Sequence, residues 1–139
     1  MNTTEVWLAI KGYEGRYEIS NFGRVRSLEH KVLVHQARYK QPRLMVWAGR
    51  LLRPGVGARG YPCVVLSNDS QRRNYRVHRL VAEHFILNPE NKPTVNHINA
   101  NKLDNRVANL EWATFLENNM HAIDAGLRPT KNKQYIRSK

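Results

Sequence analysis

The stretch that decides the fold runs from Val95 to Asn118 and reads V-N-H-I-N-A-N-K-L-D-N-R-V-A-N-L-E-W-A-T-F-L-E-N. It is rich in side-chain amides, contains one histidine and closes in the pattern of an amphipathic helix. Amide oxygens and an imidazole at these spacings can hold a hard cation beside a general base. A hydrophobic core requires neither group, so the stretch indicates a functional site.

The local pattern of this stretch predicts a strand, a turn, a link and a helix. The ranges are 95–97 for the strand, 98–102 for the turn, 106–110 for an irregular link and 114–126 for the helix. Thr114 is a suitable N-cap, and Glu117 three residues later completes a capping box. Gly126 is a plausible residue to end the helix in a left-handed conformation.

The residues before this stretch predict a hairpin and a helix. Residues 60–66 read as a strand, 67–73 as a turn and 74–78 as the start of the return strand. The following segment, H-R-L-V-A-E-H-F at residues 78–85, has a helical spacing of apolar residues.

The first half of the chain is organised differently. Residues 4–28 alternate apolar and polar side chains between glycines, which predicts short strands joined by tight turns. Residues 29–60 are basic and rich in Pro and Gly. We interpret them as a loop or insertion with short strands near 44–47 and 50–53.

Three segments, N-H-I-N-x-N-K, N-R-V-x-N-L-E-W and E-N-x-x-H-A, follow one another in the order and spacing of a known family. Together with E-x-W-x-x-I-x-G-Y-E-G-x-Y-x-I-S-N-x-G-R-V-R-S-L at residues 5–28, they resemble the HNH endonucleases of the phage and intron-encoded homing type. The resemblance implies an α+β fold with a small ββα-metal (His-Me finger) nuclease core. The division that it implies is a NUMOD-type N-terminal β-hairpin module at 1–28, a basic loop at 29–59, an HNH nuclease domain at 60–126 and a basic tail at 127–139.

The resemblance also assigns roles to individual residues. It implies that His97 is the general base, that Asn109 pins the loop that holds the base, and that Asn96 and Asn118 bind a divalent cation, Mg²⁺ or Mn²⁺. His121 lies three residues after Asn118 on the same helical face and is a second candidate for the metal or the scissile phosphate. His97 and Asn96 are neighbours on a strand and point to opposite faces, so both reach one cation only if the strand ends or bends there.

Two positions depart from the family pattern. Ala100 replaces a glycine in the turn, which predicts strain if the backbone there has a positive φ. Asn96 stands where relatives carry Asp or Asn, so both expected metal ligands are neutral amides and bind a bare cation weakly. Cys63 is the only cysteine. It excludes a structural zinc held by several cysteines, and it indicates a reducing compartment.

Composition favours a nucleic-acid partner. The chain of 139 residues carries 23 Lys and Arg against 11 Asp and Glu, a net charge of +12, which suits a polyanion. The residues expected to contact DNA are Arg24, Arg26, Arg72, Arg73, Arg76, His78, Arg79, Lys102 and Arg106. We assign His78 to structure or phosphate contact rather than to catalysis.

The function that these observations favour is a metal-dependent DNA endonuclease, a freestanding phage-type homing enzyme that nicks or cuts double-stranded DNA. A non-catalytic DNA-binding module with the same fold, or an RNA-binding or RNA-cleaving protein, remain alternatives. The oligomeric state, monomer or dimer, is open. No long apolar run and no signal peptide are visible. We therefore expect no membrane partner, and the resemblance implies a location in the cytoplasm of a bacterial host.

Overall fold

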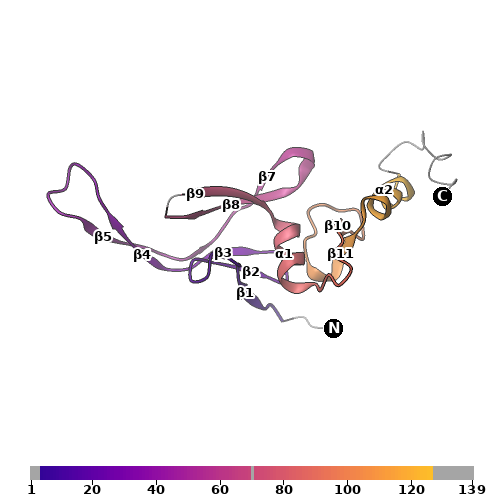
Figure 1. Ribbon diagram of the computed structural model, residues 1–139, viewed down its shortest axis with the longest axis horizontal. Coiled ribbons are helices and arrows are strands. Elements are labelled where there is room, and N and C mark those ends of the chain that lie inside the picture. Colours follow the sequence, from indigo (N-terminus) through magenta and orange to yellow (C-terminus); the bar gives the residue numbers. More distant parts are fainter. Residues whose placement is uncertain (1–3, 70, 127–139) are drawn as a thin grey trace.

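The computed structural model describes residues 4–69 and 71–126. Small antiparallel sheets follow one another along an elongated molecule, with helices gathered at the end that contains the C-terminal half of the chain (Figure 1). In chain order the elements are β1 (Trp7–Ala9), β2 (Tyr17–Ser20), β3 (Val25–Ser27), β4 (His30–Val34), β5 (Arg43–Trp47), β6 (Arg50–Leu51), β7 (Gly55–Val56), η1 (Ala58–Gly60), β8 (Pro62–Asn68), β9 (Gln71–Arg76), α1 (Val77–Phe85), β10 (Thr94–His97), η2 (Val107–Asn109), β11 (Leu110–Ala113) and α2 (Phe115–Asp124).

The N-terminal residues form an antiparallel sheet in the order β1-β2-β3-β6. The alternation of residues 17–20 places Tyr17 and Ile19 in the core, and Val25 on β3 joins them. Gly23 makes the β2–β3 turn with a φ of +83°, a conformation that favours glycine. The predicted short strands and tight turns are confirmed.

The central hairpin pairs β8 with β9, and α1 begins directly where β9 ends. Both strands run closer to the turn than predicted, because backbone pairing continues through Asn68 and Gln71. On α1, Leu80 and Val81 are buried as their helical spacing predicts, and they pack with Leu66 of β8 in the main core.

The β10–β11–α2 unit follows. β10 pairs with β11 in an antiparallel register that sets Asn96 opposite Glu111 and His97 opposite Leu110. The irregular link predicted at 106–110 is wrong in part, since 107–109 form the short helix η2 and β11 begins at Leu110. Pairing with β10 decides that strand, and no local signal in the sequence reveals the pairing.

The closing helix agrees with its sequence signals. Thr114 accepts a hydrogen bond from the Glu117 backbone N–H, and the Glu117 side chain accepts one from the Thr114 backbone, so the capping box is present. Gly126 has a φ of +74° just beyond the helix. The predicted basic tail, 127–139, lies outside the described residues.

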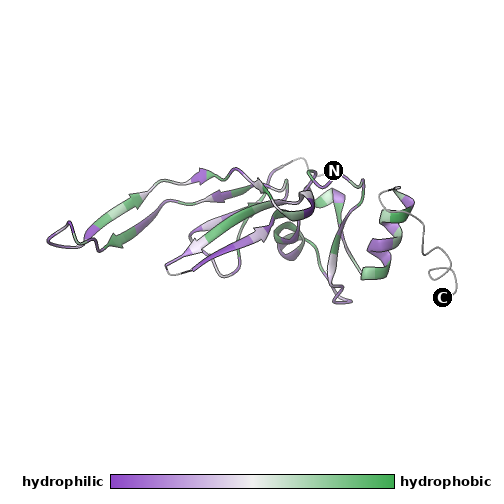
Figure 2. Cartoon of the chain, turned by 90° about the horizontal axis from the view of Figure 1, so that it is seen from above, coloured by the Kyte–Doolittle hydropathy of each residue, from purple (hydrophilic) through white to green (hydrophobic). Residues whose placement is uncertain are grey.

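The prediction of a loop over residues 29–60 is wrong in part, because the β4–β5 hairpin lies in this range. The strands expected near 44–47 and 50–53 are present as β5 and β6, but β4 is an additional strand, and it pairs with β5 along its whole length. The hairpin projects at one end of the molecule (Figure 1). Apolar residues occur on both of its strands (Figure 2), and every residue of β5 is exposed.

The helices of the structure are all short. Within residues 4–69 and 71–126, none has the length and apolar character needed to cross a membrane.

Candidate active site

His97 is the last residue of β10 and is buried. Its Nε2 lies 2.7 Å from Oδ1 of Asn105, which is also buried. An amide oxygen only accepts, so Nε2 carries the proton and Nδ1 keeps its lone pair. Burial lowers the pKa of His97, against the opposing effect of the Asn105 hydrogen bond. The ring is therefore neutral at pH 7 with one nitrogen ready to accept a proton.

Two further rings lie against His97. The centroid of the His78 ring is 5.0 Å from that of His97, and Tyr61 lies 4.8 Å from His78 and 6.0 Å from His97. His78 is 4% exposed, and its Nδ1 has no hydrogen-bond partner among the described residues. Burial, followed by the nearby His97, lowers the pKa of His78 to about 3. His78, predicted as a DNA contact, thus lies inside the site as a neutral ring.

The loop between β10 and β11 is held by side-chain amides. The Asn109 amide nitrogen donates to Oδ1 of Asn99 and to the backbone oxygen of Asp104, both at 2.9 Å. Its Oδ1 accepts from the Asn99 backbone N–H at 3.0 Å. Asn109 therefore lies where the sequence expects a residue that pins this loop. The hydrogen bond to the His97 ring comes from Asn105 instead.

The turn in this loop has the predicted strain. Ala100 has a φ of +63°, in the left-handed region, and its backbone N–H donates to the His97 oxygen at 3.0 Å. A β-carbon disfavours this conformation. The chain turns directly after His97, the last residue of β10.

The N-terminal sheet supports the same loop from outside. The Val107 backbone N–H donates to the Asn21 oxygen at 3.0 Å. A β-carbon at Gly23 would lie 2.8 Å from both the β-carbon and the backbone oxygen of Asn105. Gly23 is thus required both for its turn and for the space that Asn105 occupies.

Oxygen donors gather on the other face of the β10–β11 ribbon. The Asn96 amide nitrogen donates to Oε1 of Glu111 at 3.0 Å. These residues are cross-strand partners and share a face, opposite the one that carries His97. Asn96 is buried, and α2 contacts both strands, so we infer that α2 covers this face.

Helix α2 carries the other expected metal-site residues, Asn118 and His121. His121 Nε2 donates to the backbone oxygen of Ile98 at 2.9 Å. Asn118 lies three residues earlier on the same helical face and is partly buried. Asn96 on β10 and Asn118 on α2 thus belong to two elements that contact each other.

The chemistry of this donor set fits a hard divalent cation. Asn96, Asn118 and Glu111 offer amide and carboxylate oxygens, the ligands that Mg²⁺ and Mn²⁺ accept. No group of three or more His, Cys, Asp or Glu residues suited to a metal occurs in the described ranges 4–69 and 71–126.

Four of the residues predicted to contact DNA are paired with carboxylates. The pairs are Arg24 with Glu5 (2.6 Å), Arg26 with Glu18 (2.6 Å), Arg79 with Glu83 (3.6 Å) and Arg106 with Asp104 (2.8 Å). The Arg106 hydrogen bond is the main cause that lowers the pKa of Asp104, to about 2. To contact a phosphate, each of these arginines must either bind it together with its carboxylate partner or break that ion pair.

The other predicted cations lie nearer the stacked rings or along β9. Arg76 is 5.0 Å from the Tyr61 ring centroid and Lys102 is 4.7 Å from it. Arg72 and Arg73 are exposed on β9, the strand that Arg76 ends. Positively charged side chains therefore lie along β9 and continue to the edge of the His97 site.

Sequence reasoning missed Tyr61, Asn105 and Glu111. Asn105 stands in L-D-N-R among several asparagines, and no spacing distinguishes it from Asn99 or Asn101. Tyr61 is brought to His97 from another hairpin. Glu111 can be identified only from its register opposite Asn96, and that register requires knowledge of β11.

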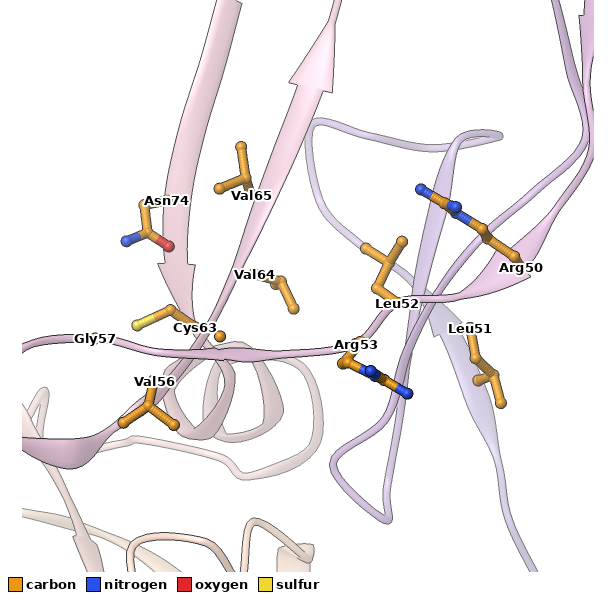
Figure 3. Close-up of a pocket in the computed structure, with 11 residues that line it drawn as sticks. Arg50, Leu51, Leu52, Arg53, Val56, Gly57, Cys63, Val64, Val65 and Asn74 are labelled. Atoms are coloured by element: carbon orange, nitrogen blue, oxygen red, sulfur yellow. The ribbon is translucent and has the colours of Figure 1, made fainter.

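A separate surface pocket lies beside β8. Leu52, Cys63 and Val64 line it, with Arg50 and Arg53 among the neighbouring side chains (Figure 3). None of its lining residues is among the residues described above for the His97 site.

Comparison with known proteins agrees with this organisation. Residues 5–67 match the NUMOD4 motif and residues 75–120 match the HNH endonuclease family. The uncharacterized HNH endonuclease L247 of Acanthamoeba polyphaga mimivirus is 38% identical over 129 residues, 89% of this chain and 27% of that protein. DNA endonuclease I-HmuI of Bacillus phage SP01 is 33% identical over 108 residues, 78% of this chain and 52% of that protein. The chain thus spans about half, or less, of the length of these curated relatives.

A solved structure has the same fold. It is described as DNA binding and cleavage by the HNH homing endonuclease I-HmuI, and it matches with a TM-score of 0.69 and 29% identity over 96% of this chain and 66% of that one. The α+β fold expected from the sequence is confirmed. The chain belongs to the HNH endonuclease family, with a NUMOD4 motif before its HNH domain.

Proposed function

We propose that this protein is a metal-dependent endonuclease that hydrolyses phosphodiester bonds in double-stranded DNA, in the manner of the phage-type homing enzymes. The observation that carries the proposal is the His97 ring, held neutral by burial and fixed by Asn105 with Nδ1 unprotonated. A general base requires this protonation state at neutral pH.

The residues have separate tasks in the hydrolysis. His97 Nδ1 accepts the proton of the attacking water, while Asn105 keeps the ring in the required tautomer and orientation. Asn109 and Asn99 hold the loop that carries Asn105. Arg76 and Lys102 are placed to neutralise phosphate charge beside the rings.

The cation is Mg²⁺ or Mn²⁺ in this proposal. Asn96 and Asn118 would hold it, with His121 as a further candidate for the metal or the phosphate. When bound, a divalent cation stabilises charge on the phosphoryl oxygens and on the leaving oxygen. Neutral amides bind it weakly, so we expect most binding to occur together with the DNA phosphate.

The exposed arginines of β9 support DNA as the partner. Arg72, Arg73 and Arg76 follow one strand toward the site, and sequence-independent binding through such residues depends steeply on salt. Relatives from a phage and a giant virus favour a virus-encoded enzyme. We propose that it acts in the cytoplasm of a bacterial host.

A plasmid assay tests the proposal. Supercoiled DNA is incubated with the protein and Mg²⁺, with Mn²⁺, and with a chelator, beside the His97→Ala variant. We expect metal-dependent conversion by the wild type alone. Open circles indicate one cut strand per encounter, as from a monomer with one site, and linear product indicates cutting of both strands, as from a dimer.

The same assay separates the alternatives. A gel shift with no cleavage in either metal would replace the enzyme with a DNA-binding module. Cleavage of RNA but not of the plasmid would move the substrate class to RNA. Both results would contradict the proposed function.

A further inference from the structure

Glu111 is a carboxylate placed beside an expected metal ligand. It lies opposite Asn96 in the β10–β11 register, and its Oε1 accepts the Asn96 amide proton at 3.0 Å. Asn96 is 6% exposed, whereas Glu111 is exposed. The pair therefore joins a buried amide to a carboxylate at the edge of the site.

The other carboxylates around the site are neutralised. Asp104 is bound to Arg106 and Asn99, and Glu117 is bound to Lys92 and to the N-cap of α2. Glu111 makes no salt bridge in the described part of the chain, and Asn96 is its hydrogen-bond partner there.

Glu111 offers a hard cation an anionic oxygen ligand. Two amide oxygens carry no net charge, and hard cations favour carboxylate oxygens. The second oxygen of Glu111, Oε2, makes no hydrogen bond to the described residues. The carboxylate is thus oriented by Asn96 through one oxygen and free at the other.

We propose that the Glu111 carboxylate belongs to the cation site and supplies the negative charge that Asn96 lacks. Asn96 has two tasks in this arrangement, since its amide nitrogen orients Glu111 and its oxygen remains for the cation. This inference rests on the proposed function for the identity of the site, but it makes a separate statement about which residue carries the charge.

The test measures Mn²⁺ binding to the full chain without DNA, by the loss of the free-ion signal in electron paramagnetic resonance. Glu111→Gln should weaken Mn²⁺ binding roughly 10-fold or more, the cost expected for losing a group that orients or charges a metal site. Glu111→Asp should retain most of the affinity. The exchanged pair Asn96→Asp with Glu111→Gln keeps one carboxylate and one amide, and it should restore binding close to the wild-type level.

A matched control removes the same charge elsewhere. Asp124 is exposed at the end of α2 and makes no salt bridge within the described residues. Asp124→Asn should leave Mn²⁺ binding unchanged. Thermal unfolding without metal verifies that each variant is folded, and it detects a merely structural role of the Asn96–Glu111 hydrogen bond.

The outcomes are distinct. Equal Mn²⁺ affinity of folded Glu111→Gln, Glu111→Asp and wild-type protein would overturn the inference, as would an equal loss in Asp124→Asn. If the wild type binds Mn²⁺ through Glu111 but fails to cut plasmid at saturating metal, the proposed function fails and the inference stands. If it cuts plasmid while Glu111→Gln binds Mn²⁺ normally, only the inference fails.

Discussion

Two antiparallel ribbons of two strands, β10–β11 and β4–β5, occur in the described part of the chain, and they differ in how far their residues are buried. In β10–β11, Val95, Asn96 and His97 are buried, and both helices contact the strands. In β4–β5, every residue of β5 is exposed, including Leu44 at 61% and Trp47 at 53%. A ribbon alone does not bury its residues, because burial depends on the elements that cover it.

The difference separates two uses of the same local structure. The covered ribbon holds polar side chains in a buried site, where hydrogen bonds set tautomers and shift pKa values. The uncovered ribbon adds nothing to the main core. Substitutions in the first should therefore alter chemistry and stability, while substitutions in the second should leave both nearly unchanged.

The largest effect is expected at the centre of the covered ribbon. His97→Ala should reduce cleavage about 10²–10⁴-fold, the usual cost of losing a general base, with DNA affinity nearly intact. Single-turnover nicking of a plasmid and a gel shift measure the two quantities. Near-normal nicking by the variant would remove His97 from its role.

Asn105 should come next, because it acts through His97. Asn105→Ala should reduce cleavage roughly 10²-fold, the cost of a misplaced catalytic group. Asn105→Asp keeps the acceptor but adds a negative charge, which raises the pKa of His97 and moves the acid limb of the rate profile to higher pH. A pH–rate profile that is the same in wild type and Asn105→Asp would show that this contact does not orient the base.

The buried His78 should make stability depend on pH. Its pKa is about 3 in the folded protein, below the ordinary 6.5, so the unfolded chain binds the proton more readily. The contribution of neutral His78 to the free energy of unfolding is then fully present above pH 6.5. Below that pH it falls by about 1.4 kcal/mol per pH unit until the folded pKa is reached. Urea unfolding from pH 7 to 5 should show a flatter dependence for His78→Gln than for wild type, and parallel curves would contradict this account.

A smaller effect on stability is expected at Ala100, in the loop that follows β10. Its φ of +63° is costly for any residue with a β-carbon, so Ala100→Gly should raise the free energy of unfolding by about 1 kcal/mol. Ala108, in η2, is the matched control because it has no positive φ, and Ala108→Gly should not stabilise the protein. Equal destabilisation by both substitutions would mean that the turn carries no strain.

The smallest effect should come from the uncovered ribbon. Leu44→Ser and Val46→Ser remove exposed apolar side chains and should change the free energy of unfolding by less than about 0.5 kcal/mol. Val95→Ser in the covered ribbon provides the contrast and should cost several times more. A large loss in the β5 variants would show that another surface covers this hairpin in solution.

The sequence predicted the parts of the fold that depend on local signals. The capping box of Thr114 and Glu117, the end of the helix at Gly126 and the alternation in β2 are properties of short segments, and the structure confirms them. β4 and β11 were missed because each is defined by its pairing partner. Strand pairing is a tertiary property, and short segments do not encode it.

The candidate site was also predicted only in part from the sequence. The strain at Ala100 and the position of Asn109 in the loop followed from turn chemistry and family resemblance. Tyr61 and Asn105 could not be identified, because only the folded chain brings a residue of another hairpin and one of several loop amides against His97. The catalytic and metal-binding roles themselves remain predictions that the experiments above address.

The close approach of Gly23 to Asn105 bears on how such proteins can be recombined. The β2–β3 turn forms one wall of the space in which the partner of His97 sits. A chimera that joined this HNH domain to an unrelated N-terminal module would lose that wall, even if the linker and the target-binding surface were well chosen. Exchange of modules should therefore succeed most readily between chains that keep a glycine with positive φ at this turn, so that the two parts are inherited as a matched pair.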